Sequence, residues 1–212
     1  MERSRVACII PAYNEEASIQ KVIQSVSSVC VPIVVDDGSC DLTYDISIAS
    51  DAIVVKHELN KGYEQALESG FKRALNDGFN YAVTIDGDGQ HDASVISRFI
   101  DALDNGADVV IGIRDKKQRF AEHVFAFFSS LRWGIKDPLC GMKAYKIELY
   151  KELGYFDSFS SVGTELAFFG ARKDKKIKQL DLKTYDRKGR SRFGSSISAN
   201  YKIMRIIFKS II

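Results

Sequence analysis

Apolar residues in the first half of the chain follow two alternating patterns. Runs that are apolar at nearly every position predict buried strands at residues 5–10, 31–35, 52–55, 81–85 and 108–113. Between these runs, apolar residues recur at helical spacing over residues 15–28, 42–49, 63–76 and 93–104. Alternating strands and helices predict an α/β fold with a mostly parallel central sheet covered by helices on both faces.

The alternation weakens after Arg114. Residues 119–134 are rich in phenylalanine, whereas residues 163–173 predict a helix and residues 177–182 a strand. Residues 186–196 are polar and predict a loop, and residues 197–212 predict a basic amphipathic helix. We therefore expect one domain over residues 1–196, followed by a C-terminal helix over residues 197–212.

Composition supports a folded, water-soluble domain. The 212 residues are 45% hydrophobic and 27% charged and include only 3 prolines, which excludes a disordered or collagen-like chain. No apolar run reaches the roughly 20 residues of a membrane-spanning helix. The four cysteines show no Cys-x-x-Cys spacing, so we expect reduced thiols and a cytoplasmic protein.

Charge is distributed unevenly along the chain. The net charge of +2 combines −7 over residues 1–100 with +9 over residues 101–212, and residues 172–212 alone carry +10. An acidic half suits cations, and a basic half suits phosphates or an anionic surface. Nucleic acid is one such partner, but the sequence has no stacking-aromatic motif of an RNA-binding fold.

Acidic and polar residues follow three of the predicted strands directly. They form the segments Pro11–Glu15, Asp36–Ser39 and Asp86–Asp88. In open parallel sheets, ligands bind at the carboxyl ends of strands. Clustered carboxylates repel one another unless a cation joins them, and Mg²⁺ or Mn²⁺ takes such oxygen ligands together with phosphate oxygens. The alternative interpretation is that these segments are solvated turns, which Asp-Gly sequences favour.

These segments resemble motifs of the family 2 glycosyltransferases, whose fold is the three-layer, Rossmann-like GT-A fold. The resemblance rests on Ile10–Glu16, Val34–Ser39, Asn60–Gly62 and Asp86–His91, in the family's order. Three later segments are similar to the polyprenyl-phosphate branch, which includes dolichyl-phosphate mannose and glucose synthases: Asp137–Lys143, Thr164–Leu166 and Arg187–Arg192. Met142, Lys143 and Thr164 depart from the usual residues, which leaves the sugar and the acceptor open.

The resemblance implies which residues bind the nucleotide-sugar donor, linked to UDP or GDP. Asp36 or Asp37 would hydrogen-bond the base, and Gln90 would lie beside the sugar. Asp86 and Asp88 would hold Mg²⁺ or Mn²⁺ and serve the ribose and the diphosphate. The full set that the resemblance assigns to the donor, with the nucleotide-pocket residues first, is Pro11, Tyr13, Glu15, Asp36, Asp37, Lys61, Asp86, Gln90 and Ser191.

The resemblance also implies an inverting, metal-dependent transfer. Arg114 and Arg187 would face phosphates, and Asp88 would act at the departing diphosphate. A polyprenyl-phosphate acceptor at the cytosolic face of a membrane needs no general base, because a phosphomonoester has a second pKa of about 6. A sugar-hydroxyl acceptor in polysaccharide assembly is the alternative, and it needs a base. Asp137 is then the leading candidate, although it could equally cap a helix or turn.

Other features leave alternatives open. Residues 119–134 and 197–212 mix aromatic, aliphatic and basic side chains, which predicts peripheral membrane contact or, alternatively, packing on the sheet or in a homodimer. His57 and His123 have no partner pattern and predict surface or packing roles. A sugar-phosphate nucleotidyltransferase would carry a glycine-rich loop after the first strand, where this chain has Pro11–Glu15. A non-catalytic binding module is the third class.

Overall fold

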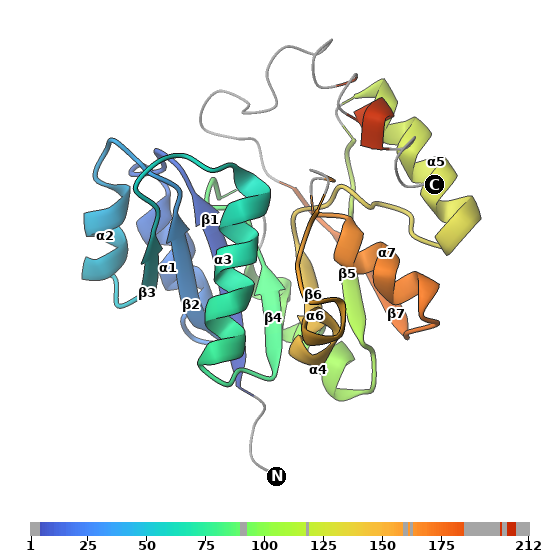
Figure 1. The fold of residues 1–212 in the computed structure, drawn as a ribbon, viewed down its shortest axis with the longest axis horizontal. Helices are drawn as coiled ribbons and strands as arrows, with labels where there is room; N and C mark the ends of the chain where they lie inside the picture. The colour runs from blue at the N-terminus through green and yellow to red at the C-terminus, as the bar shows by residue number, and fades with distance from the viewer. Residues whose placement is uncertain are drawn as a thin grey trace.

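The computed structural model describes residues 5–89, 93–117, 119–158, 161, 163–184, 200 and 203–206. They form one sheet with helices on both faces (Figure 1). The strands are β1 (Val6–Ala12), β2 (Val31–Asp36), β3 (Ile53–Lys56), β4 (Tyr81–Thr84), β5 (Val109–Arg114), β6 (Lys143–Lys146) and β7 (Ile177–Leu182). The helices are α1 (Ile19–Val26), α2 (Thr43–Ala49), α3 (Tyr63–Asn76), α4 (Ile96–Asp104), α5 (Phe120–Trp133), α6 (Ile147–Leu153) and α7 (Glu165–Arg172), with a 3₁₀ turn at Ala93–Val95.

The sheet has the order β3-β2-β1-β4-β6-β5-β7. All neighbouring pairs are parallel except those of β6, which runs antiparallel to both β4 and β5. The prediction of a mostly parallel α/β sheet is confirmed. The chain moves outward from β1 through β2 to β3 and then returns to the other side of β1 for β4. Open sheets of this kind bind ligands in a crevice outside the carboxyl ends of the strands at such a reversal, which here lies between β1 and β4.

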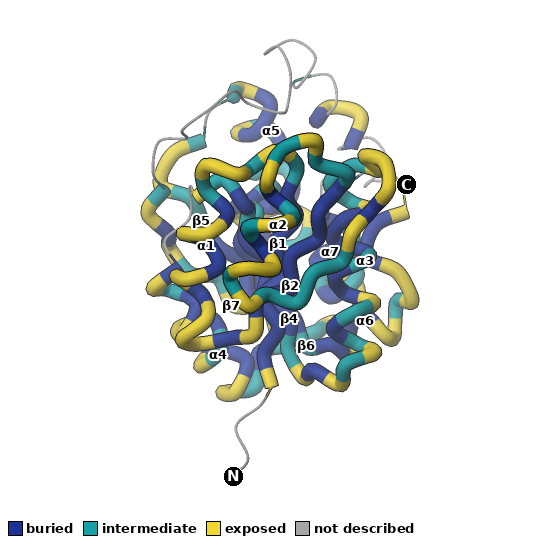
Figure 2. The backbone as a smooth tube through the Cα atoms, turned by 90° about the vertical axis from the view of Figure 1, so that its left-hand side faces the viewer, coloured by how far each residue is buried: buried dark blue, intermediate teal, exposed yellow. Residues whose placement is uncertain are grey.

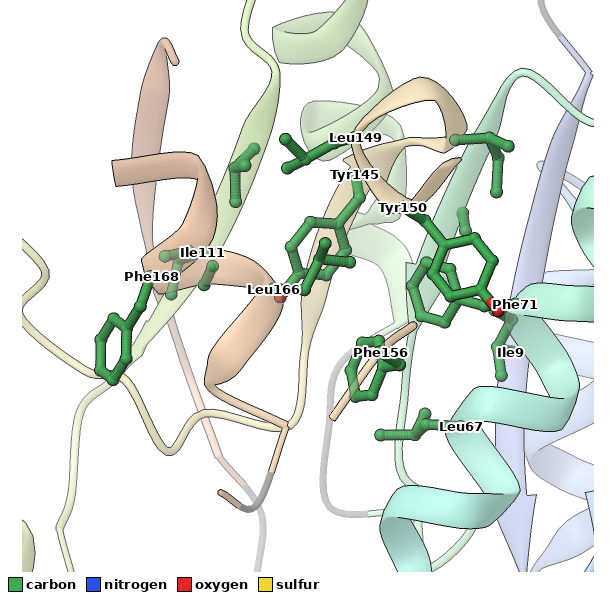
Figure 3. Close-up of a cluster of buried hydrophobic side chains, with 14 of the residues drawn as sticks. Ile9, Leu67, Phe71, Ile111, Tyr145, Leu149, Tyr150, Phe156, Leu166 and Phe168 are labelled. Carbon is green, nitrogen blue, oxygen red and sulfur yellow. The ribbon is translucent and has the colours of Figure 1, made fainter. Parts of the chain in front are cut away.

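Two apolar cores lie on the two faces of the sheet. Alternate residues of β1 point to opposite faces, so Ile9 belongs to one core and Ile10 to the other. The first core packs α3, α5, α6 and α7 on the sheet and contains the aromatic cluster of Figure 3, in which the Phe71 and Phe156 rings are stacked with centroids 4.7 Å apart. The second core packs α1 and α4 on the other face. Figure 2 shows the central strands β1, β2 and β4 as mostly buried.

Pro11 lies inside β1, in the middle of the sheet, although proline lacks the N–H of a strand ladder. The carbonyl of Ile9 accepts a hydrogen bond from the backbone N of Ile85, so Ile9 faces the β4 side. Pro11, two residues on, faces the same side, and the pairing of β1 with β4 has already ended at Ile9. At Pro11, β1 therefore no longer pairs with β4, so the missing N–H removes no hydrogen bond of the β1–β4 ladder.

The first helix begins later than the sequence predicts. We expected Glu15 and Glu16 to open it, but α1 starts at Ile19. The backbone N of Glu15 donates to Thr43 Oγ1 at 2.7 Å, and a Glu16 carboxylate oxygen accepts from the backbone N of Leu42 at 3.1 Å. These contacts with the start of α2 hold residues 15 and 16 outside the helix.

The sequence also failed to predict β6 and α6. The strand Lys143–Lys146 is short and has a lysine at each end, which is atypical of a central strand. Tyr145 nevertheless lies fully buried in the first core, and Lys143 is 3% exposed. Burial on the sheet, rather than local propensity, determines the conformation of this segment.

The predicted C-terminal helix is described only at Asn200 and residues 203–206, which are helical. Ile203 and Ile206 are buried in the first core, together with Phe125 of α5. Met204 is 46% exposed and Arg205 is exposed. This turn therefore packs its two isoleucines on the protein, in agreement with the alternative that this segment packs on the sheet.

Candidate active site

The three acidic and polar motifs meet at the carboxyl ends of β1, β2 and β4. Ser18 Oγ donates to the carbonyl of Gly87 at 2.8 Å, which joins the segment after β1 to the turn after β4. The backbone N of Asn14 donates to Ser39 Oγ at 2.9 Å, which joins the same segment to the turn after β2. Residues far apart in the sequence thus lie together at the carboxyl ends of these strands.

The segment after β1 is held in a defined shape by these contacts. Asn14 has a φ of 53°, in the left-handed region that asparagine tolerates better than most residues. Its side-chain oxygen accepts from the backbone N of Cys40 at 2.9 Å. Ser18 Oγ also donates to the Glu15 carboxylate at 3.1 Å. The predicted nucleotide-pocket residues Tyr13 and Glu15 therefore lie half-buried at the strand ends.

The two aspartates after β2 have different surroundings. Asp37 is 4% exposed, and its carboxylate accepts from the backbone N of Lys61 and of Gly62, each at 2.8 Å. Asp36 is fully buried, and its Oδ1 accepts from the backbone N of Ser39 at 3.2 Å. Its Oδ2 is buried and has no hydrogen-bond partner within the described residues. Such an atom costs free energy unless a ligand donor reaches it.

His57 is the third partner of Asp37. Its Nδ1 lies 2.7 Å from Asp37 Oδ1, and its Nε2 lies 2.9 Å from Ser69 Oγ of α3. The imidazole is 5% exposed, so a surface role is excluded. The strand register indicates this pairing. Asp36 pairs with Lys56 at the ends of β2 and β3, and Asp37 and His57 are the residues that follow them.

Gly38 allows the turn after β2 to pass close to the loop after β3, next to the Asp37–His57 pair. Its φ is +75°, and a Cβ would lie 2.7 Å from the backbone carbon of Leu59. A side chain at this position would displace the loop that carries Asn60 and Lys61. The backbone of Lys61 is thus fixed by Asp37, while its side chain is exposed.

Asp86, after β4, contacts two further elements. Tyr63, the first residue of α3, donates its hydroxyl to Asp86 Oδ1 at 3.1 Å. Gly141, just before β6, lies so close that a Cβ there would collide with the Asp86 carboxylate. Burial, together with the neighbouring Asp86 carboxylate, raises the pKa of Tyr63 well above its ordinary value, so the phenol remains a donor at neutral pH. The sequence analysis did not identify Tyr63 or Gly141 as part of the site.

The carboxylate oxygens of Asp86 and Asp88 are suitable ligands for a hard divalent cation. No group of three His, Cys, Asp or Glu side chains in the described part of the chain is arranged to hold a metal ion. Mg²⁺ does not need one, since it is commonly bound by one or two carboxylates, water and substrate phosphates. Asp86 and Asp88 are both half-buried and lie two residues apart in one turn, which suits such a shared site.

Arg114 and Asp137 form an ion pair. Arg114 Nε donates to Asp137 Oδ2 and Nη2 donates to Oδ1, each at 2.9 Å. The Arg114 backbone N also donates to Oδ2 at 3.0 Å, and Nη2 reaches the buried Glu122 at 3.2 Å. Burial alone would lower the pKa of Arg114, but the hydrogen bonds with Asp137 outweigh it and raise that pKa. Asp137 is 1% exposed, and both of its oxygens accept from Arg114.

Two more buried groups lie near this ion pair. Lys143 donates from Nζ to the carbonyl of Gly163 at 3.2 Å, and burial lowers its pKa. Burial and the Asp137 carboxylate raise the pKa of Cys140 to about 12, so this free thiol stays protonated. Glu165, which could have paired with Lys143, instead accepts from the backbone N of Ser158 at 2.6 Å.

The remaining predicted site residues lie outside the described part of the chain: Gln90, Arg187 and Ser191. The structure brings together the motifs after β1, β2 and β4 at one crevice. It places Arg114 and Asp137 against each other at the end of β5.

Comparison with known proteins relates this chain to sugar-transferring enzymes. The model of the family described as glycosyl transferase family 2 matches residues 7–154. A dolichyl-phosphate hexose transferase of Haloferax volcanii is 26% identical over 200 residues, covering 88% of this chain and 86% of that protein. A polyprenol monophosphomannose synthase of Mycolicibacterium smegmatis is 37% identical over 119 residues, covering 52% of this chain and 45% of that protein.

A solved structure has the same fold. Glucosyl-3-phosphoglycerate synthase from Mycobacterium tuberculosis, crystallised with Mn²⁺, uridine diphosphate and glucosyl-3-phosphoglycerate, superposes with a TM-score of 0.78 at 22% identity. The match covers 98% of this chain and 80% of that protein. The predicted GT-A architecture is confirmed.

Proposed function

Because the chain belongs to glycosyl transferase family 2, we propose that it transfers a sugar from a nucleotide-diphosphate sugar to a polyprenyl phosphate, with inversion at the anomeric carbon. The observation that carries this proposal is the meeting of the Pro11–Glu15, Asp36–Ser39 and Asp86–Asp88 segments at one crevice. The relatives named for dolichyl-phosphate and polyprenol-phosphate sugar transfer support the acceptor class. The catalytic domain is residues 1–196.

Asp36 is the residue that we assign to the base of the nucleotide. Its buried Oδ2 is an acceptor without a partner among the described residues, and an N–H donor of a base would satisfy it. Asp37 already accepts from His57 and from the backbone of Lys61 and Gly62. We therefore assign Asp37 a structural role, in which it fixes the backbone of Lys61 and Gly62. Pro11, Tyr13 and Glu15 line the β1 side of the nucleotide pocket, and Lys61, Gln90 and Ser191 contribute to donor binding.

The diphosphate faces Asp86 and Asp88, which would hold Mg²⁺ or Mn²⁺. When bound, the cation neutralises the negative charge that develops on the departing nucleotide diphosphate. Asp86 accepts a hydrogen bond from the Tyr63 hydroxyl and lies close to Gly141. Arg187, in the polar segment of residues 186–196, supplies a further positive charge to the phosphates.

The Arg114–Asp137 ion pair favours a phosphate acceptor over a sugar hydroxyl. A hydroxyl acceptor needs a general base, and Asp137 was the candidate. Both oxygens of Asp137 accept from Arg114, and the side chain is 1% exposed. A phosphomonoester is already anionic at neutral pH and attacks without a base. We therefore assign the Arg114–Asp137 ion pair a structural role at the end of β5.

A screen of nucleotide sugars with and without a lipid acceptor tests the proposed function. UDP- and GDP-linked hexoses are incubated with the protein, Mg²⁺ or Mn²⁺, and either a short polyprenyl phosphate or free sugars. We expect a lipid-linked sugar product of inverted configuration with one donor class, and no product when the metal is chelated. Transfer to free sugars alone would establish the alternative acceptor, and no turnover of any donor would contradict enzymatic function.

One face of α5 supplies a surface suited to a membrane. Phe120, Phe127 and Leu131 are 80%, 74% and 79% exposed, and their spacing places them along one side of the helix. The opposite side, with Phe125, is buried in the first core. None of the helices in the described residues is both long and apolar enough to cross a bilayer. We therefore propose peripheral contact at the cytosolic face, where the lipid acceptor would present its phosphate.

Replacing Phe127 and Leu131 with serine should lower binding to vesicles that contain anionic lipid. Each large apolar side chain contributes about 1.5–3 kcal/mol when buried, so losing two should weaken partitioning at least tenfold. Co-sedimentation at low salt measures this effect. Ile48→Ser on α2 is the matched control, because Ile48 is 49% exposed and α2 covers the other end of the sheet (Figure 1). Equal sedimentation of all three proteins would contradict membrane contact through α5.

A further inference from the structure

Tyr63 occupies a fixed position between Asp37, which follows β2, and Asp86, which follows β4. It is the first residue of α3 and follows Lys61 and Gly62, whose backbone N–H groups donate to Asp37. The Tyr63 ring is half-buried against the first core. Its hydroxyl therefore reaches Asp86 from a helix end that is anchored at the end of β2.

The anchor is itself supported from behind. His57 lies between Asp37 and Ser69, at 2.7 Å and 2.9 Å, and Ser69 belongs to the second turn of α3. Asp37 thus holds the residues that lead into α3, and His57 holds both Asp37 and the helix. This arrangement fixes the start of α3 relative to β2, and with it the position of the Tyr63 side chain.

The Asp86 carboxylate is contacted from two directions. Tyr63 donates to Oδ1 at 3.1 Å, and the backbone of Gly141 packs closely against the carboxylate group. Gly141 is held in turn by its carbonyl, which accepts from Thr84 Oγ1 of β4 at 2.7 Å. The carboxylate therefore has a defined rotation before any ligand arrives. A metal-binding carboxylate that is oriented in advance binds its ion more tightly.

We propose that Tyr63 is a positioning residue for Asp86, and that its hydroxyl fixes the carboxylate in the orientation that receives the metal–nucleotide complex. The inference rests on the proposed function, since it takes Asp86 and Asp88 as the carboxylates that hold the cation. Tyr63 itself does not contact the cation. Its effect is on the affinity of the site for the metal in the presence of nucleotide.

The test compares Tyr63→Phe with Tyr150→Phe. Both changes remove a hydroxyl that donates to a carboxylate and keep the ring, since Tyr150 donates to the buried Glu68 at 3.0 Å. Free Mn²⁺ is measured by electron paramagnetic resonance while protein is added to the ion in the presence of saturating UDP and, in parallel, of GDP. We expect Tyr63→Phe to raise the Kd for Mn²⁺ about tenfold, the lower end of the effect seen for such partners, and Tyr150→Phe to match the wild type.

Gly141→Ala provides a second, independent variant. The new Cβ would push the Asp86 carboxylate away, and Gly141 does not have a left-handed backbone, so alanine fits the conformation there. We expect a loss of Mn²⁺ affinity at least as large as that of Tyr63→Phe. Wild-type Mn²⁺ affinity in Tyr63→Phe would overturn the inference, and so would wild-type affinity in Gly141→Ala.

Asp88→Ala separates this inference from the function on which it rests. If the wild type does not bind Mn²⁺ with either nucleotide, or if Asp88→Ala binds it equally well, then the proposed metal site is wrong. If Asp88→Ala loses Mn²⁺ but Tyr63→Phe keeps it, then the metal site stands and the positioning role of Tyr63 is wrong.

Discussion

Asp88→Ala is expected to lower the rate of sugar transfer about a thousand-fold. The proposed cation offsets the charge of the departing diphosphate, and losing several kcal/mol of that stabilisation slows the reaction by this factor. The measurement is transfer from the donor identified in the nucleotide-sugar screen, at saturating Mn²⁺. Donor binding should weaken in the presence of metal and change little in chelator, because Asp88 acts through the ion.

The control for this prediction is Asp101→Ala. Asp101 is an exposed carboxylate near the C-terminal end of α4, away from the crevice. Its removal changes the net charge by the same amount and should leave the transfer rate within twofold of the wild type. A wild-type donor affinity that is the same with and without metal would contradict the proposed site.

Asp137→Ala is expected to destabilise the fold by about 3 kcal/mol. Removing one partner of a buried ion pair typically costs about 3–5 kcal/mol, because the other charge is left uncompensated. The lower end applies here, since the Arg114 guanidinium retains Glu122 as a partner and is 17% exposed. Urea denaturation measures the loss as a lower midpoint at an unchanged slope.

This prediction distinguishes a structural Asp137 from a general base. Asp115→Ala is the control, because Asp115 follows Arg114 directly, is exposed and accepts from Thr184 Oγ1 at 2.7 Å. We expect its removal to change the free energy of unfolding by about 0.5 kcal/mol or less. If Asp137→Ala keeps wild-type stability but loses transfer to a hydroxyl acceptor, Asp137 is the base and the phosphate acceptor is the wrong choice.

The parts of the fold that local patterns determine were predictable from the sequence. The helical spacing over residues 63–76 gives α3 its observed bounds, Tyr63–Asn76. The acidic segments after β1, β2 and β4 were identifiable because each follows an apolar run directly. Their meeting at one crevice follows from the topology of parallel sheets, in which the carboxyl ends of the strands share one edge.

The parts that long-range contacts determine were not predictable in this way. Glu16 was predicted to open the first helix, but its carboxylate accepts from the backbone N of Leu42, the residue before α2. Lysine side chains are mostly exposed in proteins, but the antiparallel pairing of β6 with β4 and β5 buries Lys143. His57 has no partner within its own segment, because the register of β2 and β3 supplies Asp37 from 20 residues away.

The ion pair between Arg114 and Asp137 has a consequence for how this chain can diverge. Residues 115–136 leave the sheet after β5 and return shortly before β6, with α5 in between. The two partners join the ends of this excursion, so changes in its exposed residues would leave both of its ends in the same place on the sheet. The donor-binding segments after β1, β2 and β4 precede it in the chain, and Arg187 and Ser191 follow it. Changes on the exposed face of α5 would therefore leave the carboxylates after β2 and β4 in place.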